Sequence, residues 1–297
     1  MSSHKFEGTI TAIVTPFKKD LSIDFDKFKN LIDFQINNGV DGIVVCGSTG
    51  EAATMNHKEK LSLIITAVEH SNGRVPIIAG TGSNNTSDSI DFTFLAKEHG
   101  ADASLLVAPY YNKPTQEGLY NHFRAIADSC DIPIMLYNVP SRSTINISAE
   151  IQLKLAEDYK NIIATKEASG NLEQMSEIIK HAPSHFHLMS GDDALALPII
   201  AIGGKGVVSV ISNYLPQQFS QMVKLALEYK IEEARQLYFK MLELMKINFV
   251  ESNPTPAKAI MSKMGLLENH LRLPLMPITK HNMKVIVNIM ESSELFN

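Results

Sequence analysis

Asn161-Ile-Ile-Ala-Thr-Lys166-Glu-Ala-Ser-Gly-Asn171 is a short apolar run that ends in a lysine and continues into turn-forming residues. A run of this length, closed by Ser, Gly and Asn, predicts a buried strand followed by the start of a helix. Alternation along the strand places Ile162, Ala164 and Lys166 on one side, where the small Ala164 leaves room beneath the amine. Because lysines are rarely buried, Lys166 is either a desolvated nucleophile or a side chain that reaches water.

Similar apolar runs recur along the chain, and most of them start about thirty residues apart, the size of a βαβ unit. They are continuously apolar, as expected of parallel strands that are covered on both faces. With residues 162–166 they make eight predicted strands: Ile10–Val14, Gly42–Cys46, Val75–Ala79, Ala103–Ala108, Pro133–Tyr137, Ile162–Lys166, Phe186–Ser190 and Gly206–Ile211.

Helix signals fill most of the gaps between these runs. Asn56 and Glu59 form a capping-box pattern, Thr115 precedes a helical repeat, and Pro216 suits a first helical turn. Eight such units predict a closed (β/α)₈ barrel, the TIM-barrel architecture. An open doubly wound sheet is the alternative, but it usually carries a Gly-rich turn after its first strand, where this chain has Thr15-Pro16-Phe17.

The strand pattern stops after about residue 225. Residues 231–250, 256–264 and 279–290 are typical of helices, and prolines at 254 and 274 separate them. We therefore predict two parts, a barrel domain over residues 1–225 and a small helical domain over residues 226–297.

Composition excludes several classes of partner. The 297-residue chain has a net charge of -5, which gives no basic surface for nucleic acid. Its two cysteines, Cys46 and Cys130, form neither a disulfide framework nor a zinc spacing, and this favours the reducing cytoplasm. Residues 1–8 contain no apolar segment typical of a secretory signal, and no apolar run approaches the length of about 18 residues that a membrane span needs.

In a (β/α)₈ barrel the active site lies at the carboxyl ends of the strands. Here those ends carry hydroxyls, a lysine and an arginine: Gly47–Glu51, Tyr110 and Tyr111, Tyr137 and Arg142, Lys166, Gly191–Asp193, and Val208-Ser209. Each has an ordinary alternative, since the tyrosines could pack at the rim and the arginine could be solvated. A group of three histidines could suggest a metal, but their Pro-Ser loop favours solvated side chains, and we predict no metal site: His181, His185 and His187.

Six segments in the same order resemble the motifs of the dihydrodipicolinate synthase family, within the N-acetylneuraminate lyase superfamily. They are Gly47–Glu51, Tyr110–Gly118, Leu136–Arg142, Lys166–Asn171, Ser190–Asp193 and Leu271–Thr279, and the resemblance runs from about residue 6 to 280. Gly-Ser-Thr-Gly-Glu by itself is shared with sister aldolases. The resemblance implies a lyase that condenses pyruvate with L-aspartate 4-semialdehyde to 4-hydroxy-tetrahydrodipicolinate, in lysine and diaminopimelate biosynthesis.

The resemblance also assigns roles. It implies an imine on Lys166, proton transfer by Tyr137, and a relay through Ser48 and Tyr111, with the tyrosine reaching in from a neighbouring subunit of a homotetramer. The substrate-binding positions are Thr49, Val208 and Gly191 for pyruvate and Arg142 for the semialdehyde carboxylate. Ser48 stands where the family usually has Thr, and Val208 where it usually has Ile; both keep the chemistry. No cofactor is implied, because the iminium itself is the electron sink.

The family's lysine effector site corresponds to Ala53, His57, Lys60, Asn84, Asp88 and Tyr110. Responsive relatives usually carry His at the position of Lys60 and Glu at that of Asp88, so we expect weak or absent feedback. Two other functions stay open at this point: a sister aldolase or lyase acting on a keto-sugar acid such as N-acetylneuraminate, and a catalytically silent sensor of pyruvate or lysine. The doubled tyrosine and Arg142 speak against the first, and Lys166 speaks against the second.

Overall fold

The computed structural model describes residues 6–296 and confirms a closed barrel of eight parallel strands in the order β1 to β8. Residues 1–5, on which part of the signal-peptide prediction rests, and residue 297 lie outside the described residues. The strands are β1 (Gly8–Ala12), β2 (Gly42–Val45), β3 (Ile77–Gly80), β4 (Ala103–Val107), β5 (Ile134–Asn138), β6 (Ile162–Glu167), β7 (His187–Ser190) and β8 (Gly206–Ser209).

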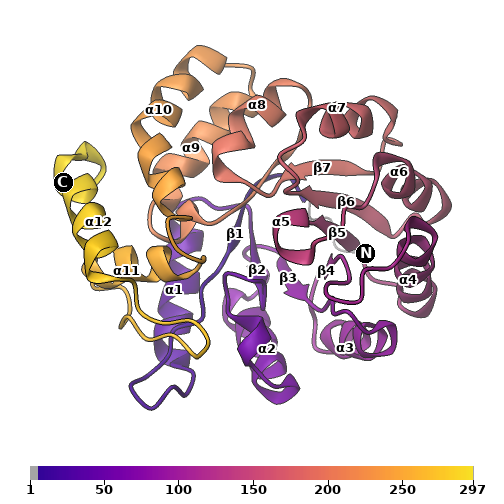
Figure 1. Ribbon diagram of the computed structural model, residues 1–297, viewed down its shortest axis with the longest axis horizontal. Helices are drawn as coiled ribbons and strands as arrows, with labels where there is room; N and C mark the ends of the chain where they lie inside the picture. The colour runs from indigo at the N-terminus through magenta and orange to yellow at the C-terminus, as the bar shows by residue number, and fades with distance from the viewer. Residues whose placement is uncertain (1–5, 297) are drawn as a thin grey trace.

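Helices surround the strands as an outer ring (Figure 1). Those of the ring are α1 (Phe25–Asn37), α2 (His57–Ser71), α3 (Thr86–Glu98), α4 (Gln116–Ser129), α6 (Ala149–Asp158), α7 (Leu172–His181), α8 (Ala196–Ala201) and α9 (Pro216–Leu227). A short helix, α5 (Pro140–Ser143), follows β5. The predicted caps are confirmed: Asn56 and Glu59 form a capping box on α2, Thr115 caps α4, and Pro216 opens α9.

All eight predicted strands exist, but some ends differ by up to two residues. β3 begins at Ile77 rather than Val75, because Pro76 has no N–H to donate to a ladder. β1 begins at Gly8 rather than Ile10, because Gly8 and Thr9 pair with Gly206 and Val207 of β8. Neither Gly8 nor Thr9 has the large apolar side chain on which the strand prediction relied. Pairing between the first and last strands of the barrel therefore extends β1 to residues that an apolar pattern does not identify.

A bulge in β6 changes which side chains share the face of Lys166. Ile134 of β5 is opposite Ile162, but the next residue, Met135, is opposite Ala164, so β6 contains one extra residue. Ile162 therefore belongs to the outer core beneath the helices, and its predicted place beside Lys166 is wrong. Ala164 does face the barrel interior, as predicted.

Two hydrophobic layers hold the barrel together. The inner one fills the barrel with side chains from every strand, among them Ile10, Ala12, Val44, Ile78, Ala103, Leu105, Met135, Tyr137, Ala164, Met189 and Val208. The outer one lies between the strands and the helices and contains most of the buried apolar residues. Because the barrel is packed with side chains below its carboxyl ends, the strand ends and their loops are the part left for chemistry.

Three more helices follow the barrel: α10 (Ile231–Ile247), α11 (Thr255–Lys263) and α12 (Lys280–Ser292). Figure 1 shows α11 and α12 together at one side of the barrel, with α10 beside α9. The predicted boundary between the two domains, after residue 225, falls in the last turn of α9, which packs on β1. The division into two domains stays a prediction.

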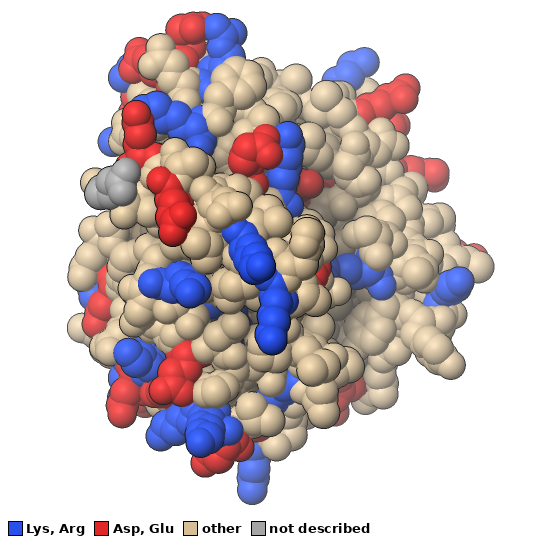
Figure 2. Space-filling view, turned by 60° about the vertical axis from the view of Figure 1, so that its left-hand side comes forward, with Lys and Arg blue, Asp and Glu red and all other residues tan. Residues whose placement is uncertain are grey.

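The face seen in Figure 2 carries acidic and basic side chains interspersed with neutral ones, without a continuous basic surface. None of the helices within residues 6–296 combines the length and the apolar character needed to cross a membrane.

Candidate active site

Lys166 and Tyr137 lie opposite each other on neighbouring strands, near the carboxyl ends of β6 and β5. The Lys166 Nζ is 4.2 Å from the centroid of the Tyr137 ring, and each residue is only 6% exposed. A buried amine next to a phenol is the combination that imine chemistry requires, since one group attacks a carbonyl and the other can move protons.

Val208 and Gly191 complete the wall of this site. Val208, on β8, is buried in the same inner core as Tyr137 and Ala164. Gly191 directly follows β7, and a Cβ added there would lie 2.6 Å from the Cβ of Ala168, so a larger residue would push into the loop after Lys166. Its N–H donates to the carbonyl of Glu167 at 2.8 Å. Glycine is thus required by close packing against the strand that carries the lysine.

The loop Gly47–Glu51 follows β2 and carries one buried and one exposed hydroxyl side chain. Thr49 is 3% exposed, and its Oγ1 accepts a hydrogen bond of 2.9 Å from the Nδ2 of Asn253. Ser48 is exposed. The loop ends at Glu51, whose φ of 58° is left-handed and turns the chain into the short helix that follows.

Tyr111 is a predicted site residue that this chain leaves largely exposed. It lies after β4 with a φ of 72°, and 88% of the residue is exposed. Neighbouring Tyr110 is 41% exposed, and its carbonyl accepts from the Asn84 side chain at 3.1 Å. The ring is therefore accessible to a neighbouring subunit, on which Tyr111 is expected to act.

Arg142 lies on α5, over the same end of the barrel, and is exposed. One of its N–H groups, on Nη2, donates to the backbone carbonyl of Asn253 at 3.2 Å. A guanidinium has five donors, so the fork retains N–H groups that can bind a carboxylate.

Sequence reasoning missed a buried polar network directly behind Lys166. The carboxylate of Glu167 is fully buried and accepts hydrogen bonds of 2.9 to 3.1 Å from three side-chain amides and one backbone N–H, those of Asn138, Gln152, Gln174 and Ser169. Asn138 follows Tyr137, and Glu167 follows Lys166. The network therefore joins the two strands immediately beyond the reactive pair. A glutamate next to the lysine was the available signal, although its amide partners are scattered along the sequence.

Asp193, one of the predicted strand-end residues, is a second buried carboxylate. It accepts from the backbone N–H groups of Val210 and Ile211 at 3.1 and 2.8 Å, so it fixes the end of β8 next to Val208. Burial raises the pKa of Asp193 to about 6, and the hydrogen bonds from Ile211 and Ser209 oppose that rise.

The C-terminal helices reach this end of the barrel through a buried ion pair. Lys258 of α11 binds Glu51, and neither side chain has any exposed surface. Lys258 also donates to the carbonyl of His270 at 2.9 Å, while the second oxygen of Glu51 accepts from the N–H of Arg272 at 3.1 Å. Burial lowers the pKa of Lys258 to about 8, although the adjacent carboxylate opposes this shift. This ion pair therefore connects the loop that carries Thr49 to the C-terminal helices.

Several of the predicted effector residues contact one another or a shared ring between α2 and α3. His57 lies 3.1 Å from Asp88 and stacks on Phe92, with ring centroids 5.0 Å apart. Lys60 lies over the same ring, with its Nζ 4.9 Å from the Phe92 centroid. Asn84 contacts Tyr110 as described above, and Ala53 is exposed in the short helix before α2.

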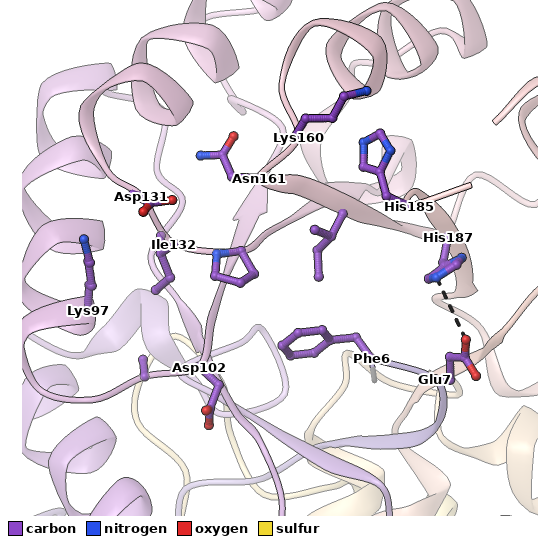
Figure 3. Close-up of a pocket in the computed structure, with 13 residues that line it drawn as sticks. Phe6, Glu7, Lys97, Asp102, Asp131, Ile132, Lys160, Asn161, His185 and His187 are labelled. Carbon is purple, nitrogen blue, oxygen red and sulfur yellow. Dashed lines mark ion pairs between the residues drawn. The ribbon is translucent and has the colours of Figure 1, made fainter. Parts of the chain in front are cut away.

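A cavity of about 620 Å³ lies at the opposite end of the barrel from Lys166 (Figure 3). It is lined by residues at the amino ends of the strands, among them Phe6, Asp102, Asn161 and His185. His187 also lines it and is half-buried at the start of β7. The predicted strand over Phe186–Ser190 is thus confirmed there, and the placement of His187 in a solvated loop is wrong. Within residues 6–296, no three or more His, Cys, Asp or Glu side chains are grouped as a metal site.

Comparison with known proteins gives consistent matches over nearly the full length. The chain matches the model of the Dihydrodipicolinate synthetase family over residues 5–293. A relative from Hydrogenobaculum sp. (strain Y04AAS1), named 4-hydroxy-tetrahydrodipicolinate synthase, is 46% identical over 288 residues, which is 97% of this chain and 99% of that relative.

Two solved structures show the same fold. The crystal structure of dihydrodipicolinate synthase from Aquifex aeolicus has a TM-score of 0.95 and 42% identity, covering 96% of this chain and 97% of that one. The Cyanidioschyzon merolae enzyme, crystallised with lysine bound, has a TM-score of 0.95 and 41% identity, covering 99% and 100%. The residues that the family model matches include the strand ends that hold Lys166 and Tyr137, and the chain belongs to the dihydrodipicolinate synthetase family.

Proposed function

We propose that this chain catalyses the condensation of pyruvate with L-aspartate 4-semialdehyde to 4-hydroxy-tetrahydrodipicolinate, the first committed step of lysine and diaminopimelate biosynthesis. The observation that carries the proposal is the buried Lys166 amine, 4.2 Å from the Tyr137 ring at the strand ends of a barrel of this family. The relative from Hydrogenobaculum bears the name of this activity, so a keto-sugar acid lyase is not favoured.

Lys166 is the nucleophile in the proposed reaction. Its neutral amine attacks the ketone carbon of pyruvate, a C–N bond forms, and the ketone oxygen leaves as water after protonation. The resulting iminium acidifies the adjacent methyl group, and loss of one proton gives an enamine whose carbon attacks the aldehyde. The iminium nitrogen takes up an electron pair when the methyl proton leaves, and the enamine nitrogen returns it as the new C–C bond forms, so the reaction needs no external cofactor. The aldehyde oxygen takes up a proton and stays in the product as its hydroxyl. The amine of the semialdehyde then attacks the regenerated iminium carbon, the ring closes, and the C–N bond to Lys166 breaks to release the neutral amine.

Tyr137 moves the protons of these steps. Its ring lies against the amine, and a phenol can donate a proton to the leaving oxygen and then recover one from the methyl group. We propose that Ser48 and the Tyr111 of a neighbouring subunit connect Tyr137 to solvent. The 88% exposure of Tyr111 supports a role across a subunit boundary, in a homotetramer built as a dimer of dimers.

Four further residues bind the substrates in this proposal. The Thr49 hydroxyl and the backbone around Gly191 bind the pyruvate carboxylate, and Val208 provides the aliphatic wall beside the methyl group. Arg142 binds the carboxylate of the semialdehyde through the N–H groups that Asn253 leaves available. This division places the two carboxylates on different residues, which orients the aldehyde toward the enamine.

The setting of the reaction is also part of the proposal. We propose a cytoplasmic enzyme with small-molecule substrates, and without a nucleic-acid or membrane partner. For lysine, we propose that the cluster of His57, Lys60 and Asp88 binds the effector weakly or not at all. A lysine-bound relative shows that the family includes enzymes that bind this amino acid.

Borohydride reduction with pyruvate, followed by mass spectrometry, tests the chemistry directly. A trapped adduct on the peptide that contains Lys166 supports the imine, whereas an unmodified protein contradicts it. A panel of aldehydes then tests the substrate. Faster turnover with N-acetylmannosamine than with the semialdehyde would replace the proposed activity by that of the sister lyases.

A further inference from the structure

Asn253, between α10 and α11, contacts one residue of the proposed pyruvate site, Thr49, and the proposed semialdehyde-binding residue, Arg142. Its Nδ2 donates to the Thr49 Oγ1 at 2.9 Å, and its backbone carbonyl accepts from the Arg142 Nη2 at 3.2 Å. The residue is 5% exposed. Resting on the function proposed above, we propose that Asn253 is a positioning residue that orients the Thr49 hydroxyl toward pyruvate and couples the pyruvate and semialdehyde sites.

The direction of the hydrogen bond to Thr49 carries the argument. An amide nitrogen is only a donor, so the Thr49 oxygen must accept, and the single proton of that hydroxyl remains free to be donated elsewhere. A carboxylate is a strong acceptor for such a proton. Asn253 thus makes Thr49 a dedicated donor to the pyruvate carboxylate, where an unconstrained hydroxyl could turn toward the protein.

The contact to Arg142 is of a different kind, because it comes from the backbone of Asn253. It occupies one N–H of the guanidinium and leaves others available. Replacing the Asn253 side chain removes the bond to Thr49 but retains the carbonyl. The proposal therefore predicts a larger effect on pyruvate than on the semialdehyde, a difference that general loosening of the site would not produce.

The segment after Asn253 is held firmly enough for this role. Lys258, one turn into α11, is bound to Glu51, and Glu51 lies two residues after Thr49 in the same loop. Both ends of the connection are buried. The side chain of Asn253 is therefore fixed relative to Thr49 by an ion pair as well as by its own hydrogen bond.

The test compares Asn253→Ala and Asn253→Asp with the unchanged enzyme. The aspartate accepts the Thr49 proton and adds a negative charge near a carboxylate substrate, so it should be the more damaging change. We expect the pyruvate concentration that half-saturates borohydride trapping to rise about tenfold for Asn253→Ala and further for Asn253→Asp. The KM for the semialdehyde should change by less than the pyruvate value does.

Asn248→Asp is the matched control. Asn248 is a fully buried asparagine of the same helical region, and its Oδ1 accepts from the Tyr214 hydroxyl at 3.1 Å. None of the hydrogen bonds found within residues 6–296 joins it to Thr49 or Arg142. Its substitution should alter the thermal unfolding midpoint without changing the pyruvate half-saturation of the folded fraction.

A double-variant cycle with Thr49→Val then separates positioning from general damage. If Asn253 acts through the Thr49 hydroxyl, Asn253→Ala should add little to the loss already caused by Thr49→Val. Independent, additive losses in the two variants overturn the proposal. An unchanged pyruvate half-saturation in Asn253→Ala overturns it as well. If Asn253→Asp does not fold, the result for Asn253→Ala is sufficient by itself. Failure of the unchanged enzyme to trap pyruvate would instead contradict the proposed function itself.

Discussion

The Lys166 Nζ lies 4.2 Å from the centroid of the Tyr137 ring, and the two residues are direct partners across β6 and β5. The next pair along the same strands, Glu167 and Asn138, is hydrogen-bonded on the outer side of the barrel at 3.0 Å. Alternation sends the first pair inward and the second pair outward. A buried network on the outer side of the strands therefore helps to fix the geometry of the reactive pair.

Lys166→Ala should abolish pyruvate trapping and reduce turnover by about a thousandfold or more, because no other amine can form the imine at this position. Peptide mapping after borohydride reduction measures the first effect, and a coupled assay measures the second. Lys205→Ala, at an exposed lysine before β8, is the control and should trap pyruvate normally. Equal labelling of the Lys166→Ala protein would show that the imine forms elsewhere.

Tyr137→Phe should lower kcat by about a hundredfold or more, while the pyruvate half-saturation changes less, because proton transfer matters in the transition state. Ser48→Ala and Tyr111→Phe should act in the same direction. The Tyr137→Phe/Tyr111→Phe double variant should be barely worse than the poorer single variant, since the groups work as one relay. Strictly multiplicative losses would argue that they act separately.

Mixing Lys166→Ala chains with Tyr111→Phe chains should restore part of the activity. If Tyr111 serves a neighbouring subunit, a mixed assembly contains sites with both residues intact, and neither parent has any. The measurement is turnover after joint refolding or co-expression, with each variant alone as the baseline. Full activity of a monomer, established by sedimentation at the assay concentration, would remove the need for a second chain.

The sequence was sufficient for the barrel because parallel strands covered on both faces are apolar throughout, and eight such runs are hard to arrange otherwise. It also located Lys166 and Tyr137, since strand ends follow directly from strand positions. It gave no indication of the role of Asn253 or Lys258, whose partners Thr49 and Glu51 lie 204 and 207 residues away. The bulge at Ile163 was equally hidden, because it is set by pairing with β5 rather than by local composition.

His122 should make the protein sensitive to mild acid. It is buried on α4, and burial lowers its pKa from 6.5 to about 4, so folding holds it neutral. A depressed folded-state pKa gives stability that is present above pH 6.5 and is lost as the pH falls toward 4. The loss attributable to His122 is at most about 3 kcal/mol.

Urea unfolding of His122→Gln at pH 7 and pH 4.5 measures this contribution. The variant removes the titrating group, so its stability should fall less between the two pH values than that of the unchanged protein. His281→Gln, at an exposed histidine on α12, should behave like the unchanged protein. An identical pH dependence in all three proteins would mean that His122 does not titrate against folding.

Lysine should inhibit weakly, because the carboxylate of the cluster between α2 and α3 already has a partner and a lysine side chain belongs to the same cluster. Asp88 lies 3.1 Å from His57, so an effector ammonium would compete with that imidazole for the carboxylate. Lys60 is half-buried with its Nζ 4.9 Å from the Phe92 ring, one helical turn from His57, and its charge repels an incoming ammonium. Asp88 is also one methylene shorter than the glutamate of responsive relatives.

Steady-state assays with lysine titrated through the millimolar range check this expectation, and half-inhibition should need more than about one millimolar. Lys60→His removes the repelling charge at neutral pH and restores the usual residue, so it should increase sensitivity; Lys58→His, at an exposed lysine of the same helix, should not. Adding Asp88→Glu to Lys60→His should increase sensitivity further, since the longer carboxylate can reach an ammonium while His57 remains in place. Submillimolar inhibition of the unchanged enzyme, with no effect of Lys60→His, would mean that Lys60 stays over Phe92 without opposing the effector.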